Sequence, residues 1–389
     1  MPRSSDDLAA AMQAASLVGD GPDLDAVTEE LIEERKKAIP VVDIEALDVV
    51  RPLGMGGQGG VWLSADPTSG LMMAVKQIRK GRLTMLPKKA MMRALTEREC
   101  LLEVGYHPFI TTCYACFQNE SSLFFAIELA PSGDLFGLLD MYPTGLAEQH
   151  ARFYCTNIAL ALRHVHVHGW VYRDIKLENV LITQDGYLKI CDFGFAKKAA
   201  ATRTFTKCGT DEYAPPEVVS GRGRTCAADW WALGILLHEM LTGRPPFEGS
   251  SAEEIFRSIS DFSSGGSASA DKLQATLRHT AEHLSTNCSA FLMGLLQARE
   301  NDRIGAGPAG FIQIQTHAWY DGVDWEATLR REVTVPWIPP PNDDGAVDVG
   351  IDFSREDVML DRQYATEQWA ETFKDFGPYR TASWAGEDR

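Results

Sequence analysis

The chain has 389 residues, enough to bury a large core, and a formal net charge of −17 at pH 7. This acidity disfavours a nucleic-acid partner, because neutralising phosphates needs a basic face. The acidity is concentrated at the ends, with net charges of −8 for residues 1–48 and −7 for residues 341–389. Both arms are therefore candidates for solvated segments or for packing around a near-neutral core.

The N-terminal sequence predicts no targeting segment. Met1-Pro2-Arg3 opens no apolar run, and Pro2 stands where N-myristoylation needs glycine. The longest apolar stretch, residues 230–237, is too short to span a bilayer, so we expect no membrane span. The eight cysteines have no framework spacing, which is typical of a reducing compartment. We expect a cytoplasmic protein, with the nucleus as a second location.

Two local patterns suggest metal ligands but have a simpler interpretation. Cys113 and Cys116 form a C-x-x-C without a second pair, so we expect them to alternate along a strand. His164, His166 and His168 lie at the end of a long predicted helix with no further ligand cluster. We expect solvated loop histidines there.

The predicted elements follow in chain order. Residues 24–37 have apolar positions on one face, early acids and late bases, which favours a helix that Pro40 ends. Strands and one helix should continue to a hinge at residues 127–129. A mostly helical region from 133 to 325 should follow, with a Ser/Gly-rich loop at 260–270 and an extended tail from residue 336.

A glycine-rich turn comes early in the strand region. Gly54, Gly56, Gly59 and Val61 match G-x-G-x-x-G-x-V between two strand-like runs. Glycine is needed where backbone amides approach phosphates closely, since a Cβ would obstruct them. The pattern alone fits a flexible hairpin equally well.

A lysine ends the next strand-like run. Lys76 closes Met73-Ala74-Val75-Lys76 and should hold nucleotide phosphates if a helical carboxylate pairs with it. We choose Glu97, which forms a Glu-x-x-x-Leu pattern with Leu101. Glu99 is the alternative.

The most informative pattern is Tyr172-Arg173-Asp174-Ile175-Lys176-Leu177-Glu178-Asn179, followed by Asp192-Phe193-Gly194. Such residues place a carboxylate where a substrate hydroxyl must be oriented, and oxygen ligands where Mg²⁺ bridges phosphates. Either part alone is weak evidence. Together, in this order, they predict phosphoryl-transfer chemistry.

Residues 209–217 (Gly-Thr-Asp-Glu-Tyr-Ala-Pro-Pro-Glu) resemble the stretch that closes the activation segment of protein kinases, with Pro215 where that stretch usually has alanine. Proline fits there only if φ is already near −65° and the amide is unpaired. Asp229 and Trp230, and then Arg303, are the last members of this series of motifs along the chain.

In this order the motifs resemble the AGC group of serine/threonine protein kinases, closest to the cyclic-nucleotide-dependent branch. The specific residues are Cys208-Gly209-Thr210-x-Glu212-Tyr213, Asp229-Trp230-Trp231-Ala232-Leu233-Gly234, Pro245-Pro246-Phe247 and Phe373-Lys374-Asp375-Phe376. The resemblance implies an α+β, bilobal kinase fold. Its parts would be an N-terminal extension (1–48), a small lobe (49–128), a large lobe (129–325) and a C-terminal tail (326–389).

The resemblance also implies ATP and Mg²⁺ as cofactors. Asp174, Lys176 and Asn179 would be catalytic, Asn179 and Asp192 would bind the metal, Asp229 would anchor the catalytic loop, and Arg303 would pair with Glu217. The residues that would contact ATP or support that contact are Gly54, Gly56, Gly59, Val61, Ala74, Lys76, Glu97, Glu128, Ala130 and Asp134.

Thr206 stands where the resemblance places an activating phosphothreonine. Arg93, Arg173 and Lys197 are the residues that would receive its phosphate through charge-assisted hydrogen bonds. An exposed, unmodified threonine is the plain alternative.

Three acids stand where basophilic kinases of this group bind substrate arginines: Asp134, Glu178 and Glu239. We therefore expect protein substrates with basic residues before the Ser/Thr, arginine being preferred two and three residues upstream. Lys207 and Asp211 replace the usual neighbours of the pocket after the phosphoacceptor, so the preference there is open.

The resemblance implies that Phe373 and Phe376 dock in an apolar pocket beside the Glu97 helix. Gly377 follows them, so the phosphorylatable residue of some relatives is absent and docking should be constitutive. Phe353 is a weaker candidate to close over the adenine pocket. The alternative is an acidic tail with incidental aromatics.

Two rival classes fit less well. A pseudokinase scaffold usually loses Lys76, Asp174 or Asp192, and all three are present. A small-molecule phosphotransferase would lack the activation segment and the aromatic tail. Regulation stays open between a separate regulatory subunit or inhibitor and control by phosphorylation and the chain's own tails.

Overall fold

The computed structural model describes residues 23–44, 46–56, 59–81, 88–198, 203–204, 209–264, 284–306, 310–340, 373, 376–377 and 379–380. The chain divides into two compact units. The sheet unit comprises Thr28–Pro131 and Pro340–Arg389, and the helical unit comprises Met1–Val27 and Ser132–Pro339. The expected lobe boundary at residue 128 lies close to this division, whereas residues 326–339 of the expected tail belong to the helical unit.

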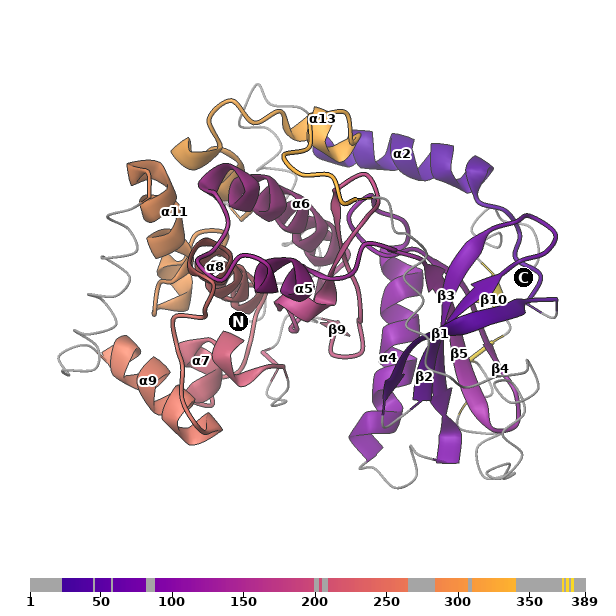
Figure 1. Cartoon of the computed structure of the whole chain (residues 1–389). Helices are drawn as coiled ribbons and strands as arrows, with labels where there is room; N and C mark the ends of the chain where they lie inside the picture. Colours follow the sequence, from indigo (N-terminus) through magenta and orange to yellow (C-terminus); the bar gives the residue numbers. More distant parts are fainter. Residues whose placement is uncertain are drawn as a thin grey trace. The chain divides into compact units, whose positions relative to one another are not determined.

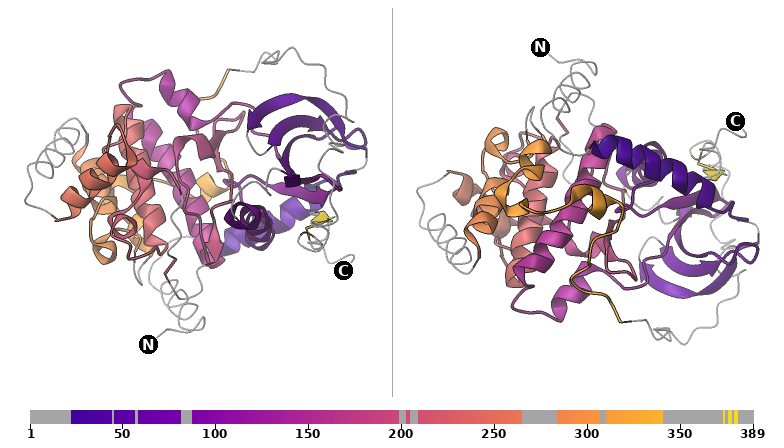
Figure 2. Two further views of the ribbon diagram at one scale, coloured as in Figure 1. Left: turned by 90° about the horizontal axis from the view of Figure 1, so that it is seen from below. Right: turned by 90° about the horizontal axis from the view of Figure 1, so that it is seen from above.

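The sheet unit is built on one antiparallel sheet in the order β1-β2-β3-β5-β4-β10 (Figure 1). Figure 2 shows the curvature of this sheet from two further sides. Its core joins buried side chains of β3, β4 and β5, including Val75, Phe117 and Phe124. The elements are β1 (Asp48–Gly56), β2 (Gly59–Ala65), β3 (Met72–Arg79), α4 (Lys88–Val104), β4 (Cys113–Gln118), β5 (Ser122–Glu128) and β10 (Tyr379–Arg380).

A bulge in β4 brings Cys113 and Cys116 together. Cys113 pairs with Ile127 and Cys116 with Phe125, but the pairing shifts by one residue between them. Because the bulge adds one residue, both thiols lie on the same face of the sheet, and their sulfur atoms are 3.5 Å apart. The expectation that they alternate along the strand is therefore wrong, because it assumed an unbroken period of two.

The helical unit contains the large apolar helix α8, which packs beside α6 and α11 (Figure 1). Trp231 of α8 is fully buried and packs on Phe247, with ring centroids 5.7 Å apart. The elements are α5 (Leu135–Asp140), α6 (Glu148–Val167), β6 (Trp170–Val171), η1 (Leu177–Asn179), β7 (Val180–Ile182), β8 (Leu188–Ile190), β9 (Lys197–Lys198), η2 (Asp211–Tyr213), α7 (Pro216–Val219), α8 (Ala227–Thr242), α9 (Ala252–Ser264), α11 (Thr286–Leu295), η3 (Glu300–Asp302), α12 (Ile312–Gln315), η4 (Ala318–Tyr320) and α13 (Trp325–Leu329).

The predicted N-terminal helix is present as α2 (Leu24–Ala38). The predicted loop at 260–270 is wrong over its first residues, because α9 extends to Ser264, with Ile255, Ile259 and Phe262 as its buried stripe. Periodicity there outweighs the Ser-rich composition. No helix within the described ranges is long and apolar enough to cross a membrane.

Candidate active site

The catalytic loop lies in the helical unit, between β6 and β7. The Nδ2 of Asn179 donates to Oδ2 of Asp174 at 2.7 Å and to the Asp174 carbonyl at 2.9 Å. Both side chains are buried. Burial raises the pKa of Asp174, while the charge of Lys176 and the Asn179 hydrogen bond oppose that shift. Asp174, Lys176 and Asn179 are therefore brought together as expected.

Asp192 follows β8 and joins the same loop. The amide of Cys191 donates to the carbonyl of Asn179 at 3.0 Å, which fixes the start of the Asp192-Phe193-Gly194 turn beside the catalytic loop. Asp192 has φ of 54°, and Arg173 has φ of 71°. Non-glycine residues rarely adopt this left-handed conformation, and those that do cluster at functional sites. The Asp192 carboxylate and the Asn179 amide oxygen are the hard donors that Mg²⁺ prefers.

The buried carboxylate of Asp229 holds this loop from α8. It accepts hydrogen bonds from the amides of Tyr172 at 2.9 Å and Arg173 at 2.8 Å. Nε2 of His166 lies 2.8 Å from the same carboxylate. The expectation that Asp229 anchors the catalytic loop is confirmed.

The expectation of solvated histidines is wrong for His164 and His166, whereas His168 is exposed as expected. His164 is buried, His166 contacts Asp229, and the rings of His164 and His168 lie 4.4 Å apart. The sequence could not show this, because the contact of His166 with α8 joins residues 63 positions apart. Throughout the described part of the chain, no three His, Cys, Asp or Glu side chains gather as a metal site would require.

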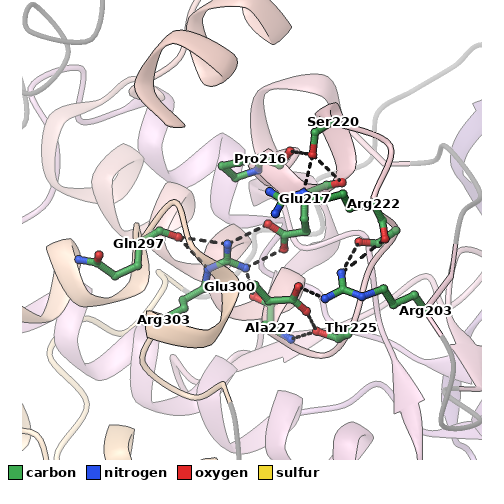
Figure 3. Close-up of polar contacts among 11 residues, drawn as sticks. Arg203, Pro216, Glu217, Ser220, Arg222, Thr225, Ala227, Gln297, Glu300 and Arg303 are labelled. Atoms are coloured by element: carbon green, nitrogen blue, oxygen red, sulfur yellow. Dashed lines mark hydrogen bonds and ion pairs between the residues drawn. The ribbon is translucent and has the colours of Figure 1, made fainter. Parts of the chain in front are cut away.

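Glu217 and Arg303 form the expected ion pair (Figure 3). Nη1 and Nη2 of Arg303 donate to the two carboxylate oxygens at 2.9 and 3.0 Å, and both side chains are almost fully buried. Nη1 also donates to the carbonyl of Ala227 at 2.6 Å. Pro215 has φ of −78° and lies just before α7, so the proline fits this position without strain.

The sheet unit supplies the lysine and its partner. Nζ of Lys76 on β3 lies 2.7 and 2.9 Å from the two oxygens of Glu97 on α4. Glu97 is buried, whereas Glu99 is exposed. The choice of Glu97 over Glu99 is therefore confirmed.

The glycine turn joins β1 and β2, where Gly54 pairs with Val61 and Gly56 with Gly59. A Cβ on Gly59 would lie 1.9 Å from the carbonyl oxygen of Gln77 on β3. Gly59 is thus required by packing within the sheet, besides the phosphate approach inferred from the sequence. Gly57 and Gln58 lie outside the described residues.

Ala74 on β3 is buried and pairs with Ile127 on β5. The amide of Glu128 donates to the carbonyl of Thr112 at 2.8 Å, and its carboxylate accepts from the amide and hydroxyl of Thr112. Ala130 follows β5, in the segment expected to read adenine.

The three substrate acids all lie in the helical unit. Asp134 caps α5 by accepting from the amide of Gly137 at 2.8 Å, and Glu178 is exposed on η1. Glu239 on α8 accepts a hydrogen bond from the hydroxyl of Tyr213. The pKa of Glu239 is raised to about 7, mainly by burial; the Tyr213 hydrogen bond opposes the shift and neighbouring carboxylates, first among them Glu178, contribute to it.

Thr206 lies outside the described residues, so its modification stays a prediction. Nε of Arg173 donates to the carbonyl of Phe195 at 2.6 Å, and Nη1 lies 3.4 Å from the hydroxyl of Thr204. Lys197 is exposed on β9, and Arg93 is exposed on α4. Arg173 thus contacts the segment that contains Thr206, two residues before it.

The tail phenylalanines are docked in the sheet unit, as expected. Phe373 and Phe376 are fully buried, and Phe376 packs edge-on against Phe125 with centroids 5.3 Å apart. Nε of Arg98 donates to the carbonyl of Phe376 at 2.8 Å, and Nε2 of Gln118 to that of Phe373 at 2.6 Å. Phe353 lies outside the described residues.

Sequence reasoning missed the polar groups that hold the tail. Arg98 and Gln118 bond to backbone carbonyls 278 and 255 positions away in the sequence. A carbonyl leaves no trace in a residue pattern, so no local signal could have found these contacts. β10 was missed as well, because it has only two residues and its pairing with β4 is non-local.

Comparisons with known proteins agree with this geometry. The protein kinase domain family matches residues 47–320. The chain is 35% identical over 318 residues to "Ribosomal protein S6 kinase alpha-6" of Danio rerio, covering 80% of this chain and 40% of that protein. It is 36% identical over 301 residues to "Serine/threonine-protein kinase AtPK2/AtPK19" of Arabidopsis thaliana, covering 77% and 60%.

The chain thus spans less than two thirds of the length of these relatives. A particular closeness to cyclic-nucleotide-dependent kinases stays a prediction. The family match covers most of the chain and includes every motif from the glycine turn to Arg303. The chain belongs to the protein kinase family.

Proposed function

We propose that this chain is a serine/threonine protein kinase of the AGC group that transfers the γ-phosphoryl group of ATP to proteins with arginines before the acceptor. The observation that carries the proposal is the Asp174–Asn179 contact beside Asp192, with Arg173 and Asp192 in left-handed conformations. The Lys76–Glu97 pair of the sheet unit supports it independently. The S6 kinases and AtPK2/AtPK19 are named for the same class of activity.

The roles follow from the chemistry of each group. Asp174 orients the acceptor hydroxyl and takes its proton, and Lys176 steadies the transferring phosphoryl group. Lys76, held by Glu97, neutralises nucleotide phosphates. Because the transition state is loosely bonded, alignment and charge neutralisation supply most of the rate enhancement.

Mg²⁺ fits the oxygen donors of Asn179 and Asp192 and would supply further charge neutralisation at the phosphates. The Nδ2 atom of Asn179 is bonded to Asp174, which directs the amide group by a buried contact. Asp192 is exposed, so its carboxylate is accessible to a cation.

Substrate arginines would bind Asp134, Glu178 and Glu239. All three are carboxylates of one unit, and a planar guanidinium can pair with a carboxylate through two parallel hydrogen bonds. We also propose that Thr206 is phosphorylated and that a regulatory subunit or inhibitor binds the kinase. Its proposed location is the cytoplasm, with the nucleus as a second location.

Labelled ATP, Mg²⁺ and a peptide with arginines two and three residues before a serine test the proposal. The wild-type chain should label the peptide, and Asp174→Asn should lower kcat by roughly 10²- to 10⁴-fold, the usual contribution of a positioned base. Asp321→Asn, an exposed change, is the control. A wild-type chain that binds ATP but labels no Ser/Thr peptide would instead indicate a scaffold.

A further inference from the structure

Glu300 carries an interaction that neither the motifs nor the family resemblance singled out. It begins η3 in the helical unit, and its side chain is only 11% exposed. One carboxylate oxygen accepts from Nη2 of Arg203 at 2.6 Å, and the other accepts from the hydroxyl of Thr225 (Figure 3). Both oxygens are thus bonded to different segments of the chain.

The first of these segments lies between Asp192 and Glu217. Besides its bond to Glu300, Arg203 donates from Nη1 to the carbonyl of Gly223 at 3.3 Å. The next residue, Thr204, pairs with Arg224 through two backbone hydrogen bonds of 3.1 and 2.8 Å.

The second segment is the one that leads into α8. Thr225 follows Arg224 directly, and its hydroxyl also accepts from the amide of Ala227 at 3.3 Å. Glu300 therefore binds both partners of the Thr204–Arg224 pairing through their neighbours, Arg203 on one side and Thr225 on the other.

This pairing is in contact with the catalytic loop. Nη1 of Arg173 lies 3.4 Å from the hydroxyl of Thr204, and Nη1 of Arg224 donates to the carbonyl of Arg173 at 3.1 Å. Arg173 immediately precedes Asp174 and has a strained φ of 71°. Groups that hold Thr204 and Arg224 therefore help to hold the strained residue beside the catalytic carboxylate.

Glu300 itself has a fixed position. It lies three residues before Arg303, whose guanidinium is locked to Glu217, Ala227 and Gln297. An ordinary exposed ion pair contributes little because both partners are mobile and screened. Here the carboxylate is mostly buried and both of its oxygens are used, so its geometry is specified.

We propose that Glu300 is a positioning residue for phosphoryl transfer. Its carboxylate holds Arg203 and Thr225 together, keeps Thr204 paired with Arg224, and through them keeps Arg173 and Asp174 aligned. The inference rests on the proposed kinase function.

Glu300→Gln tests it, because the amide keeps the size and can still accept from Thr225, but it loses the charge that attracts Arg203. We expect kcat for peptide phosphorylation to fall roughly tenfold, as small misplacements of reacting groups do, while the KM for ATP stays within about twofold. The matched control is Glu326→Gln, which removes a partly exposed ion pair between Glu326 on α13 and Arg330, the residue that follows this helix. The control should leave both constants unchanged.

Arg203→Gln removes the same ion pair from its other side. This change is less at risk of a folding defect, because the Arg203 side chain is 41% exposed. It should reproduce the loss in kcat, Arg203→Lys should restore part of it, and the double variant Arg203→Gln with Glu300→Gln should lose no more than either alone. A kcat for Glu300→Gln equal to that of Glu326→Gln, or additive losses in the double variant, would overturn the proposal.

Hydrogen exchange supplies a readout that does not depend on catalysis. The amides of Thr204 and Arg224 should exchange faster in Glu300→Gln than in Glu326→Gln, since each donates across the pairing that Glu300 supports. Unchanged exchange would overturn the positioning role. Faster exchange in a chain whose wild type phosphorylates no peptide would uphold the structural link and refute the kinase function instead.

Discussion

Nε of Arg98 donates a hydrogen bond of 2.8 Å to the carbonyl of Phe376, and Arg98 directly follows Glu97, the partner of Lys76. The tail therefore bonds to α4 next to the carboxylate that orients the lysine. Because Phe376 also packs on Phe125 of β5, the tail contacts both α4 and the sheet. This arrangement couples the docking of the tail to the Lys76–Glu97 pair within one unit.

Replacing both tail phenylalanines, Phe373→Ala with Phe376→Ala, should destabilise the sheet unit. Both side chains are fully buried, and truncating a buried phenylalanine to alanine costs about 3–5 kcal/mol. The loss should also free α4 and so weaken the Lys76–Glu97 pair. Thermal unfolding and peptide phosphorylation measure the two effects.

Phe136→Ala is the control for that variant, because this phenylalanine is 55% exposed on α5. It should leave the melting temperature almost unchanged. A double variant that melts and turns over like the wild-type chain would show that the docked tail contributes nothing.

Gly377→Ala and Gly377→Asp should release the segment that follows the aromatic motif. A Cβ at this position would lie 2.4 Å from the carbonyl oxygen of Cys116 and 3.0 Å from Cα of Phe117, both in the backbone of β4. The pairing of Tyr379 with Cys116 should therefore be lost, and the melting temperature should fall. An acidic residue here should weaken docking, contrary to the effect expected where relatives carry a phosphorylatable residue.

Gly137→Ala is the matched glycine control. A Cβ there would lie 3.5 Å from Oδ1 of Asp134, an ordinary contact, and alanine favours a helix by about 1 kcal/mol. Its melting temperature should stay equal or rise. If Gly377→Asp were as stable as the wild-type chain and more active, the steric argument would be refuted.

Much of the site could be predicted from the sequence, because its motifs are local. Asp174 and Asn179 are five positions apart, and short spacing fixes their contact through one turn of backbone. The choice of Glu97 over Glu99 succeeded because the spacing of Glu97 to Leu101 resembles the kinase pattern.

The missed features depend on contacts between distant residues. The Cys113–Cys116 contact needs a bulge that follows from how β4 pairs with β5, and the His166–Asp229 contact needs α6 to pack beside α8. Arg203 and Glu300 are 97 positions apart, and neither belongs to a motif. Sequence patterns indicate which face of an element is apolar, but not which polar groups meet across the packed faces.

Glu97→Gln should reduce kcat/KM strongly, while Glu99→Gln should not. The amide retains the shape of Glu97 but removes the charge that holds Nζ of Lys76 at 2.7 and 2.9 Å. Loss of a charged partner in a partly buried pair costs about 1.5–3 kcal/mol, or roughly 10- to 100-fold in kcat/KM. Steady-state kinetics with varied ATP measures the effect, and equal losses in the two variants would mean that the pair is not functional.

The binding of arginine-containing peptides should strengthen as the pH rises from 6 to 8. Burial, opposed by the Tyr213 hydrogen bond and assisted by the nearby Glu178, Glu212 and Glu248, raises the pKa of Glu239 to about 7. A guanidinium pairs with the ionised carboxylate, so KM should fall roughly tenfold across this range, following the ionised fraction of a group with a pKa of about 7. Glu239→Gln should bind the peptide weakly and with little pH dependence.

The same shift has an opposite consequence for stability. Because the folded pKa of about 7 lies above the unfolded value near 4.5, the folded chain binds more protons between these values, and stability falls as the pH rises through this window. Glu239→Gln should therefore gain stability relative to the wild-type chain at pH 8 but not at pH 5. Thermal unfolding at pH 5 and pH 8 measures the change in stability, and the pH profile of KM measures the opposite change in peptide binding. If the KM of the wild-type chain did not change with pH while its stability did, Glu239 would be a buried, titrating group that does not bind the substrate.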